Sequence, residues 1–189
     1  MNFTNVSALL ALSFVFAPAV LAQSTTTTVT GQNGDTATTN VTRIRDGNLV
    51  NVNRNTTFGN GTTTSSQRST TINPDGSYSS AIQRTNRAGQ TTPYRVNGQY
   101  SRTGNTITRT GTVTNGTTGQ QGTFDKTRTC VSGTCTGTRI YTGAQGRTRT
   151  ETFTSTRTAP GQRTGTVNVT RRNGSTNQVT FQTSRTRTR

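Results

Sequence analysis

Turn-forming glycines recur along the chain in two interleaved series, and their spacing limits the possible folds. One series, with intervals of 28 or 29 residues, comprises Gly47, Gly76, Gly104, Gly133 and Gly161. The other, with intervals of 27 to 30 residues, comprises Gly34, Gly61, Gly89, Gly116, Gly146 and Gly174. A random low-complexity chain would not keep two such series in step. The spacing therefore indicates a repeat of about 28 residues in six copies.

Several of these glycines belong to dipeptides that are typical of hairpin turns. In Asn60-Gly61, Asp75-Gly76 and Asn173-Gly174, both residues tolerate the positive φ of a type I′ turn. Eleven such turns divide the chain after residue 22 into twelve strands of nine or ten residues. The predicted fold is all-β: an antiparallel up-and-down meander of six β-hairpin repeats. The meander forms either a single twisted sheet or a soluble barrel.

Between the turns the residues alternate with a period of two, so each predicted strand has two different faces. In the segment 106–114, threonines occupy the even positions, and Ile107, Arg109 and Val113 lie at odd positions. One face is therefore rich in hydroxyl groups, and the other mixes arginine with apolar residues. A membrane barrel needs an apolar belt on every strand, which this pattern does not supply.

The segment 90–102 departs from the regular pattern. It contains Pro93, which lacks a backbone N–H, and the turn-like dipeptide Asn97-Gly98. We expect these residues to produce a bulge or a broken edge in this part of the sheet.

The two cysteines fit the register of a predicted hairpin. A two-residue turn at Ser132-Gly133 places Cys130 directly opposite Cys135. Cross-strand neighbours of this kind lie within disulfide distance. We therefore predict a Cys130–Cys135 disulfide with a structural role. The spacing differs from C-x-x-C, and the chain has no histidine, so neither a redox motif nor a zinc site is indicated.

Residues 1–22 have the pattern of a secretory signal peptide. A ten-residue apolar run at 8–17 is followed by Pro18 and then Val20-Leu21-Ala22. The run is too short to span a bilayer. We expect cleavage after Ala22, a mature Thr/Arg-rich repeat domain over 23–189, and a location at the cell surface, outside the cell or in the periplasm.

The mature segment combines few apolar residues with a high charge. It contains one Leu, five Ile, ten Val and four Phe, and it carries the whole net charge of +16. Such a composition is typical of disordered chains. Its 48 threonines, however, are β-branched and favour strands. Together with the regular repeat, they lead us to expect an ordered β structure.

The acidic residues do not suggest catalysis. Asp35, Asp46 and Asp75 lie in or beside predicted turns, where Asp hydrogen-bonds the local backbone. Asp125 and Glu151 stand alone on different strands, where we expect them to pair with Arg or Lys. Acid–base and nucleophilic catalysis need a positioned proton carrier. We therefore expect a protein without enzymatic activity, cofactor or metal.

The basic residues suggest contact with polyanions. Twenty of the 21 are Arg, and Lys126 is the single Lys. The planar guanidinium suits carboxylate, sulfate and phosphate groups. We predict a surface or extracellular-matrix protein that binds anionic polysaccharide, lipopolysaccharide or extracellular DNA. The predicted contact residues are Arg43, Arg45, Arg109, Arg128, Arg139, Arg147, Arg149, Arg157, Arg171, Arg185, Arg187 and Arg189.

Two other functions are compatible with the pattern. Repeated hairpins with an open edge could self-associate into a fibre, although the charge of +16 opposes this. Rows of Thr-x-Thr could bind ice, and Thr134-Cys135-Thr136 resembles the Thr-Cys-Thr step of insect antifreeze proteins. That resemblance is confined to one tripeptide, and β-propensity alone accounts for the threonines.

Overall fold

The computed structural model describes residues 21–31, 34–171 and 173–188, with the backbone alone for residues 187 and 188. The strands within these ranges are β1 (Leu21–Thr30), β2 (Thr36–Asp46), β3 (Leu49–Phe58), β4 (Thr63–Ile72), β5 (Ser77–Thr85), β6 (Thr91–Thr103), β7 (Thr106–Asn115), β8 (Gln121–Val131), β9 (Thr134–Thr142), β10 (Thr148–Ala159), β11 (Gln162–Thr170) and β12 (Thr176–Thr188).

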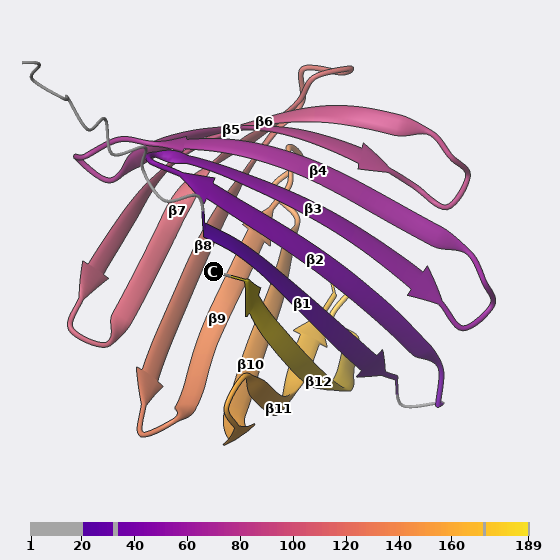
Figure 1. The fold of residues 1–189 in the computed structure, drawn as a ribbon. Helices are drawn as coiled ribbons and strands as arrows, with labels where there is room; N and C mark the ends of the chain where they lie inside the picture. The colour runs from indigo at the N-terminus through magenta and orange to yellow at the C-terminus, as the bar shows by residue number, and fades with distance from the viewer. Residues whose placement is uncertain (1–20, 32–33, 172, 189) are drawn as a thin grey trace, which may run out of the picture.

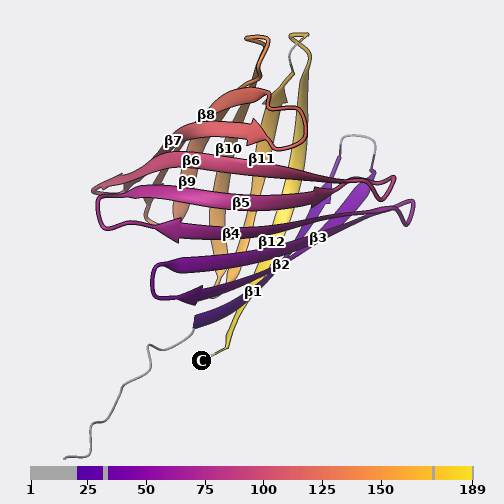
Figure 2. The ribbon, with the colours of Figure 1, turned by 90° about the horizontal axis from the view of Figure 1, so that it is seen from above.

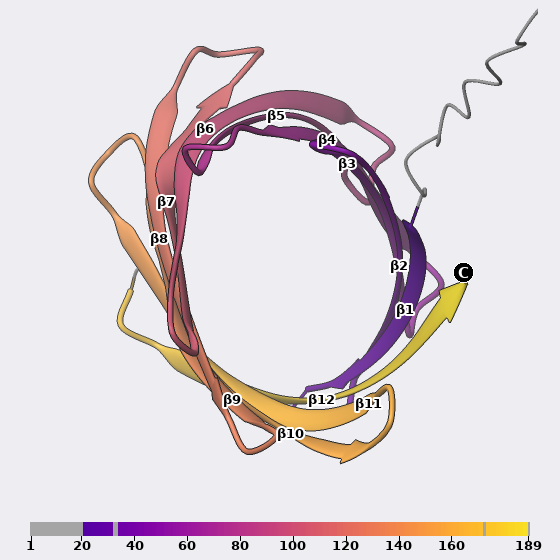
Figure 3. The ribbon, with the colours of Figure 1, turned by 60° about the vertical axis from the view of Figure 1, so that its left-hand side comes forward.

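The twelve strands form an antiparallel meander that closes into a barrel (Figure 1). Consecutive strands pair along the whole chain, and β1 pairs with β12 to complete the ring, as Figure 3 shows. The all-β hairpin meander is thus confirmed, and of the two predicted forms the closed barrel is the one observed. Twelve strands about 4.8 Å apart and tilted by about 40° give a backbone radius of roughly 12 Å.

The two series of glycines mark the two ends of the barrel (Figure 2). At one end, the tight-turn end, most hairpins have two-residue loops, such as Ser132-Gly133 between β8 and β9. At the other, the loop end, wider loops join the strands. In the loop between β5 and β6, Asn86 N–H donates to the Gln90 carbonyl, and Gly89 N–H donates to the Asn86 carbonyl. Alternate turns lie at opposite ends because the chain runs up and down.

One predicted turn is wrong in its position. Between β7 and β8 the glycine with positive φ is Gly119, at 70°, whereas Gly116 was expected. Gly116 N–H instead donates to the Pro93 carbonyl, which extends the pairing with β6. The Asn115 side chain accepts bonds from the N–H groups of Thr117 and Thr118, so the reversal comes later in the loop.

The predicted break in the segment 90–102 is also wrong. β6 runs without a register shift against both β5 and β7. In an antiparallel ladder, the N–H and C=O of one residue point to the same neighbour. The Pro93 carbonyl accepts from Gly116, so the missing N–H faces the loop beyond the end of β7 and costs no bond to β5.

The inner wall over β5 to β8 carries the hydrophobic core. Tyr78, Ile82, Val96 and Phe124 are its buried members. Directly paired strands also place an aromatic ring against a glycine: Tyr78 against Gly98, Phe124 against Gly111, Phe153 against Gly137, and Phe181 against Gly165. A ring lying over a neighbouring glycine covers backbone that has no side chain of its own.

The described part of the chain contains no helix that is long and apolar enough to cross a membrane. Most of the expected signal peptide, residues 1–20, lies outside the described residues. β1 begins at Leu21, so cleavage after Ala22 would remove only its first two residues.

Candidate functional site

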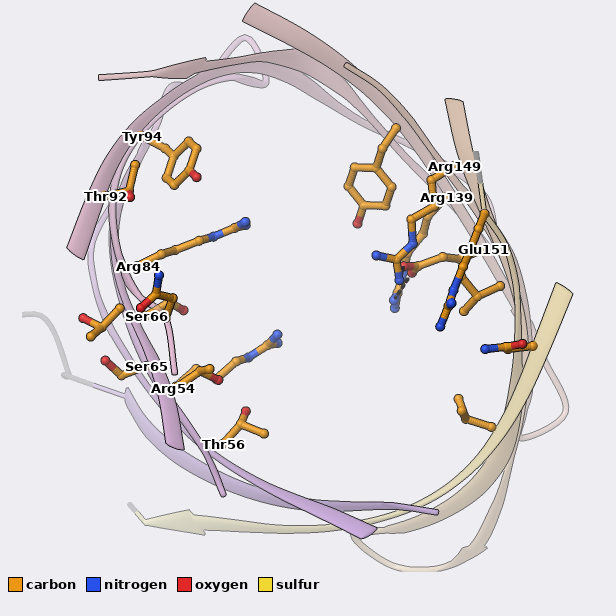
Figure 4. A pocket seen from close by; sticks show the side chains of 18 of the residues that line it. Arg54, Thr56, Ser65, Ser66, Arg84, Thr92, Tyr94, Arg139, Arg149 and Glu151 are labelled. Atoms are coloured by element: carbon orange, nitrogen blue, oxygen red, sulfur yellow. Dashed lines mark hydrogen bonds and ion pairs between the residues drawn. The ribbon is translucent and has the colours of Figure 1, made fainter. Parts of the chain in front are cut away.

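Closure of the barrel places the two predicted faces of each strand on opposite sides of the wall. The threonine face points outward, and the arginine face lines the lumen. Figure 4 shows Arg54, Arg84, Arg139 and Arg149 reaching into the interior. The ladder register puts further basic residues on this inner face: Arg43, Arg45, Arg68, Arg102, Arg109, Lys126, Arg128, Arg157, Arg163 and Arg185.

Cations occupy directly paired positions on neighbouring strands of the inner wall. Arg109 of β7 pairs with Lys126 of β8, and Lys126 pairs with Arg139 of β9. Glu151 of β10 lies next in the same row, opposite Arg139. Like charges in directly opposed positions destabilise a sheet. The row Arg109–Lys126–Arg139, with a single carboxylate at one end, therefore lowers the stability of the barrel.

Glu151 is buried and holds two of the arginines in place. Its carboxylate accepts from Arg139 Nη1 at 3.2 Å and from Arg149 Nη2 at 2.6 Å. The expected pairing of Glu151 is thus confirmed. Asp125 instead lies on the outer face between Thr110 and Ile140, and it makes no ion pair within the described residues. The expectation that Asp125 pairs with a base is wrong, because the pleat directs it away from the basic lumen.

An open cavity of about 1280 Å³ occupies the lumen at the loop end (Figure 4). Arg54 and Arg84 extend into it from one wall, and Arg139 and Arg149 extend from the facing wall. Tyr94 and Tyr141 also line it, as does Arg171 after the end of β11. The cavity therefore presents several guanidinium groups and one carboxylate, that of Glu151, among its lining residues.

Burial in the lumen lowers the pKa of several arginines. Burial, followed by the charges of Arg139 and Arg84, lowers the pKa of Arg54. Burial is also the largest cause of the lowered pKa of Arg68. Arg139 and Arg84 stand on strands that are not neighbours of β3, so the charges act across the interior. Arginine stays protonated in proteins, so the lowered values mark electrostatic strain and not neutralisation.

Aromatic rings support many of the cationic side chains. Guanidinium carbons lie 5.2 Å from the Tyr94 centroid for Arg84 and 5.3 Å from the Tyr100 centroid for Arg109. The ammonium of Lys126 lies 4.7 Å from the Phe124 centroid and 4.9 Å from that of Tyr141. The faces of aromatic rings attract cations, so these contacts orient the charged groups and partly offset their repulsion.

The predicted disulfide between Cys130 and Cys135 is present. Cys135 is fully buried, and the bridge lies on the inner face. Arg128 Nε donates to Cys130 Sγ at 3.1 Å, and Arg163 Nη1 donates to Cys135 Sγ at 3.0 Å. The bridge thus joins β8 to β9 and also anchors two luminal guanidiniums.

Most of the predicted arginines share the luminal face, two lie elsewhere, and the side chains of two others lie outside the described part of the chain. Arg147 lies in the exposed loop between β9 and β10, and Arg171 lies at the mouth of the lumen. Arg187 pairs with Gln23 through the backbone of β12, and Arg189 lies outside the described residues. Sequence reasoning missed Arg54, Arg68, Arg84, Arg102, Arg163 and Lys126. Counting alternate positions outward from each turn would have placed all six on the arginine face.

Neither a protein-family model nor a curated protein sequence matches this chain. The described residues contain no group of three or more His, Cys, Asp or Glu side chains that could hold a metal ion. The site is therefore defined by its own geometry, which is that of a confined, arginine-rich cavity.

Proposed function

We propose that this chain is an exported, non-catalytic binding protein that holds the anionic groups of a linear polyanion in the lumen of its barrel. The carrying observation is the row Arg109–Lys126–Arg139, in which cations on three adjacent strands face one another directly. Such an arrangement costs stability in the free protein. A bound anion would relieve the repulsion, so folding and anion binding are coupled.

The chemistry of the cavity favours carboxylate or sulfate groups on a flexible chain. Arginine binds such groups through two parallel N–H···O bonds. Arg54 and Arg84 on one wall face Arg139 and Arg149 on the other, so a chain entering between the walls would meet donors on both sides. We therefore favour a carboxylated or sulfated polysaccharide as the ligand.

The position of the charges argues against duplex DNA. With a backbone radius of roughly 12 Å and a lining of long side chains, the lumen is too narrow for a double helix. Arg95 is the one basic residue on the outer face of the described strands, and it lies opposite Ala81 and Thr114. A duplex would thus find little positive charge to contact.

Two features support export. A disulfide is typical of proteins that fold in an oxidising compartment, and Cys130–Cys135 is such a bridge. Residues 1–22 have the pattern of a secretory signal peptide. A basic lumen that opens outside the cytoplasm would meet anionic polysaccharides of the cell envelope or matrix.

Calorimetry with a heparin-derived oligosaccharide tests the proposal. The variant Arg54→Gln/Arg84→Gln removes two luminal cations that make no ion pair within the described residues. The variant Arg95→Gln removes one outer cation and serves as the control. We expect the luminal variant to bind at least ~10-fold more weakly and the control to bind like the wild type. Binding should also weaken steeply between about 50 and 300 mM salt.

Equal binding by the wild type and the luminal variant would contradict the proposal, as would the absence of binding at either salt concentration. Because Arg54→Gln/Arg84→Gln removes repulsion, we expect it to unfold at the same or a higher temperature than the wild type. Thermal denaturation checks this expectation, and weaker binding by a variant that remains folded would be assigned to the two missing cations.

A second candidate function, ice binding, is favoured by one feature of the outer face. Threonines from nine consecutive strands of the ring form a single lateral row: Thr36, Thr30, Thr180, Thr166, Thr154, Thr136, Thr129, Thr106 and Thr103. The strands that carry this row lie about 4.8 Å apart, and within it the hydroxyl oxygens of Thr106 and Thr129 lie 2.8 Å apart. An ice recrystallisation assay with Thr136→Lys and Thr154→Lys variants tests this candidate. Equal activity of the wild type and a buffer control would exclude it.

The fibre alternative has less support. Edge-to-edge assembly needs a strand with unpaired backbone groups. β1 and β12 pair with each other over nine residue pairs from Ala22–Thr188 to Thr30–Thr180. With the ring closed in this way, we do not propose self-assembly as the function.

A further inference from the structure

Lys126 differs in its chemistry from the arginines that surround it in the lumen. It is the single lysine of a chain with 20 arginines, and it stands between Arg109 and Arg139 in the cationic row. Its ammonium lies over two rings, those of Phe124 and Tyr141. A lysine amine can act as a nucleophile when it loses its proton, whereas a guanidinium remains protonated.

We propose that Lys126 is a covalent capture site, whose amine forms an imine with anions that carry an aldehyde or ketone group. This inference rests on the proposed function, because the luminal arginines would first bind the anionic group. The open-chain reducing end of an acidic sugar belongs to this ligand class. In the reaction, the lysine nitrogen attacks the carbonyl carbon, a C=N bond replaces C=O, and one water molecule leaves with the carbonyl oxygen.

A covalent capture site needs a ligand close to the amine and an amine that can lose its proton. The surroundings of Lys126 supply both. Arg139 and Tyr141, which adjoin Lys126, also line the large cavity, so one layer of side chains lies between a ligand held there and the amine. Within the described residues, Lys126 forms no ion pair with a carboxylate that would hold its proton. The carboxylate of Glu151 is already engaged by Arg139 and Arg149.

Electrostatics increase the share of neutral amine. Burial is the largest cause of the lowered pKa of Lys126, followed by the charges of Arg139, Arg68 and Arg109, whereas Glu151 acts in the opposite direction. The resulting pKa is about 8. At pH 7 a lysine of this pKa has ~300-fold more neutral amine than one of ordinary pKa.

Reductive trapping with glyoxylate and cyanoborohydride tests the inference. The experiment uses the variant Arg95→Lys, which adds one lysine on the outer face and leaves Lys126 in the lumen. Peptide mapping then compares the two lysines within the same molecule. We expect Lys126 to be modified at least ~10-fold faster than the outer lysine at pH 7. Lys126→Arg should abolish the luminal adduct.

A neutral aldehyde, propanal, separates the effect of the arginines from that of the amine. We expect the preference for Lys126 to be smaller with propanal than with glyoxylate. Adding 300 mM salt should lower the glyoxylate preference towards that of propanal, since salt screens the attraction of the carboxylate. Equal preference for the two aldehydes would overturn anion-directed capture.

Failure of this inference can be distinguished from failure of the proposed function. Equal or slower modification of Lys126 than of the outer lysine, with heparin oligosaccharide still bound in the lumen, would overturn the covalent capture alone. The absence of both the adduct and the binding would overturn the proposed function as well.

Discussion

Single residues on the inner wall determine how closely neighbouring strands approach. A side chain at Gly165 would place its Cβ 2.7 Å from the Phe181 ring and against the Thr154 carbonyl oxygen. Because neither neighbour is a flexible chain end, glycine is required there. The same reasoning applies to the other glycines that lie beneath aromatic rings.

We predict that Gly165→Ala destabilises the barrel by about 1–3 kcal/mol, as overpacking of a tight interior does. Gly31→Ala is the matched control, because its Cβ would meet only Asp35, with the nearest atom at 3.6 Å. Urea denaturation followed by circular dichroism measures both variants. Equal stability of Gly165→Ala and the wild type would show that the ring does not lie over this glycine.

Lys126 makes the stability of the protein depend on pH. Its pKa falls from 10.5 to about 8 on folding. Between these values the unfolded chain binds more protons than the folded one, so stability rises with pH. We predict a gain of about 1–2 kcal/mol between pH 8 and 9.5.

The variant Lys126→Met lacks this titration and should show a smaller gain over the same range. The groups facing Lys126 are Arg109, Arg139, Arg68, Glu151 and Tyr141. The arginines stay charged in this range. Burial raises the pKa of Tyr141 above its ordinary value of 10.0. Urea titrations at several pH values provide the test, and identical slopes for the two proteins would contradict it.

At the scale of elements, the hairpins depend on a few positions with unusual backbone geometry. Ser132 has φ 47°, and it is the one non-glycine residue with positive φ among the described residues. Gly133 follows with φ 83°, so both turn residues lie in the left-handed region of a type I′ turn. This region is strained for serine and accepted more readily by asparagine.

We predict that Ser132→Asn stabilises the protein by about 0.5–1 kcal/mol through relief of this strain. Ser101→Asn, at an exposed position of β6 with ordinary φ, is the control and should not stabilise it. Thermal denaturation compares the three proteins. A lower melting temperature for Ser132→Asn would contradict the type I′ geometry of the turn.

Much of the element structure could be predicted from the sequence, because it depends on local signals. The turn glycines and the alternation of Thr with Arg predicted the strands, and a two-residue turn predicted the Cys130–Cys135 pair. The prediction failed where a side chain competed with the turn signal. At Asn115 the side-chain amide oxygen accepts two loop N–H groups, which moves the reversal to Gly119.

The composition of the site was less predictable than the strands. Which cations meet depends on register across several strands, and small shifts accumulate along the sheet. Arg109, Lys126 and Arg139 come together because the registers of two hairpins, β7–β8 and β8–β9, agree. The charge of Arg68 on β4, which is not a neighbour of β8, also acts on Lys126. No local pattern in the sequence encodes such a juxtaposition.

At the scale of the whole molecule, closure of the barrel determines whether the arginine face is exposed to solvent or lines a confined interior. In an open sheet, the arginines would lie on an exposed surface, where water and salt screen their charges. In the barrel they share a confined interior, and their repulsion favours a bound anion. The single pairing that separates these two arrangements joins β1 to β12, at opposite ends of the chain.

An engineered disulfide across this seam tests closure most directly. Thr27 and Thr183 are paired residues of β1 and β12, and their hydroxyl oxygens lie 3.1 Å apart. We predict that the variant Thr27→Cys/Thr183→Cys forms an intramolecular disulfide on purification in air. Thr28→Cys/Thr183→Cys, in which residue 28 faces outward, should not. Non-reducing peptide mapping of the monomer would detect the new bridge beside Cys130–Cys135. Two free engineered thiols in a protein that retains Cys130–Cys135 would mean that the sheet is open, and the lumen on which the account depends would not exist.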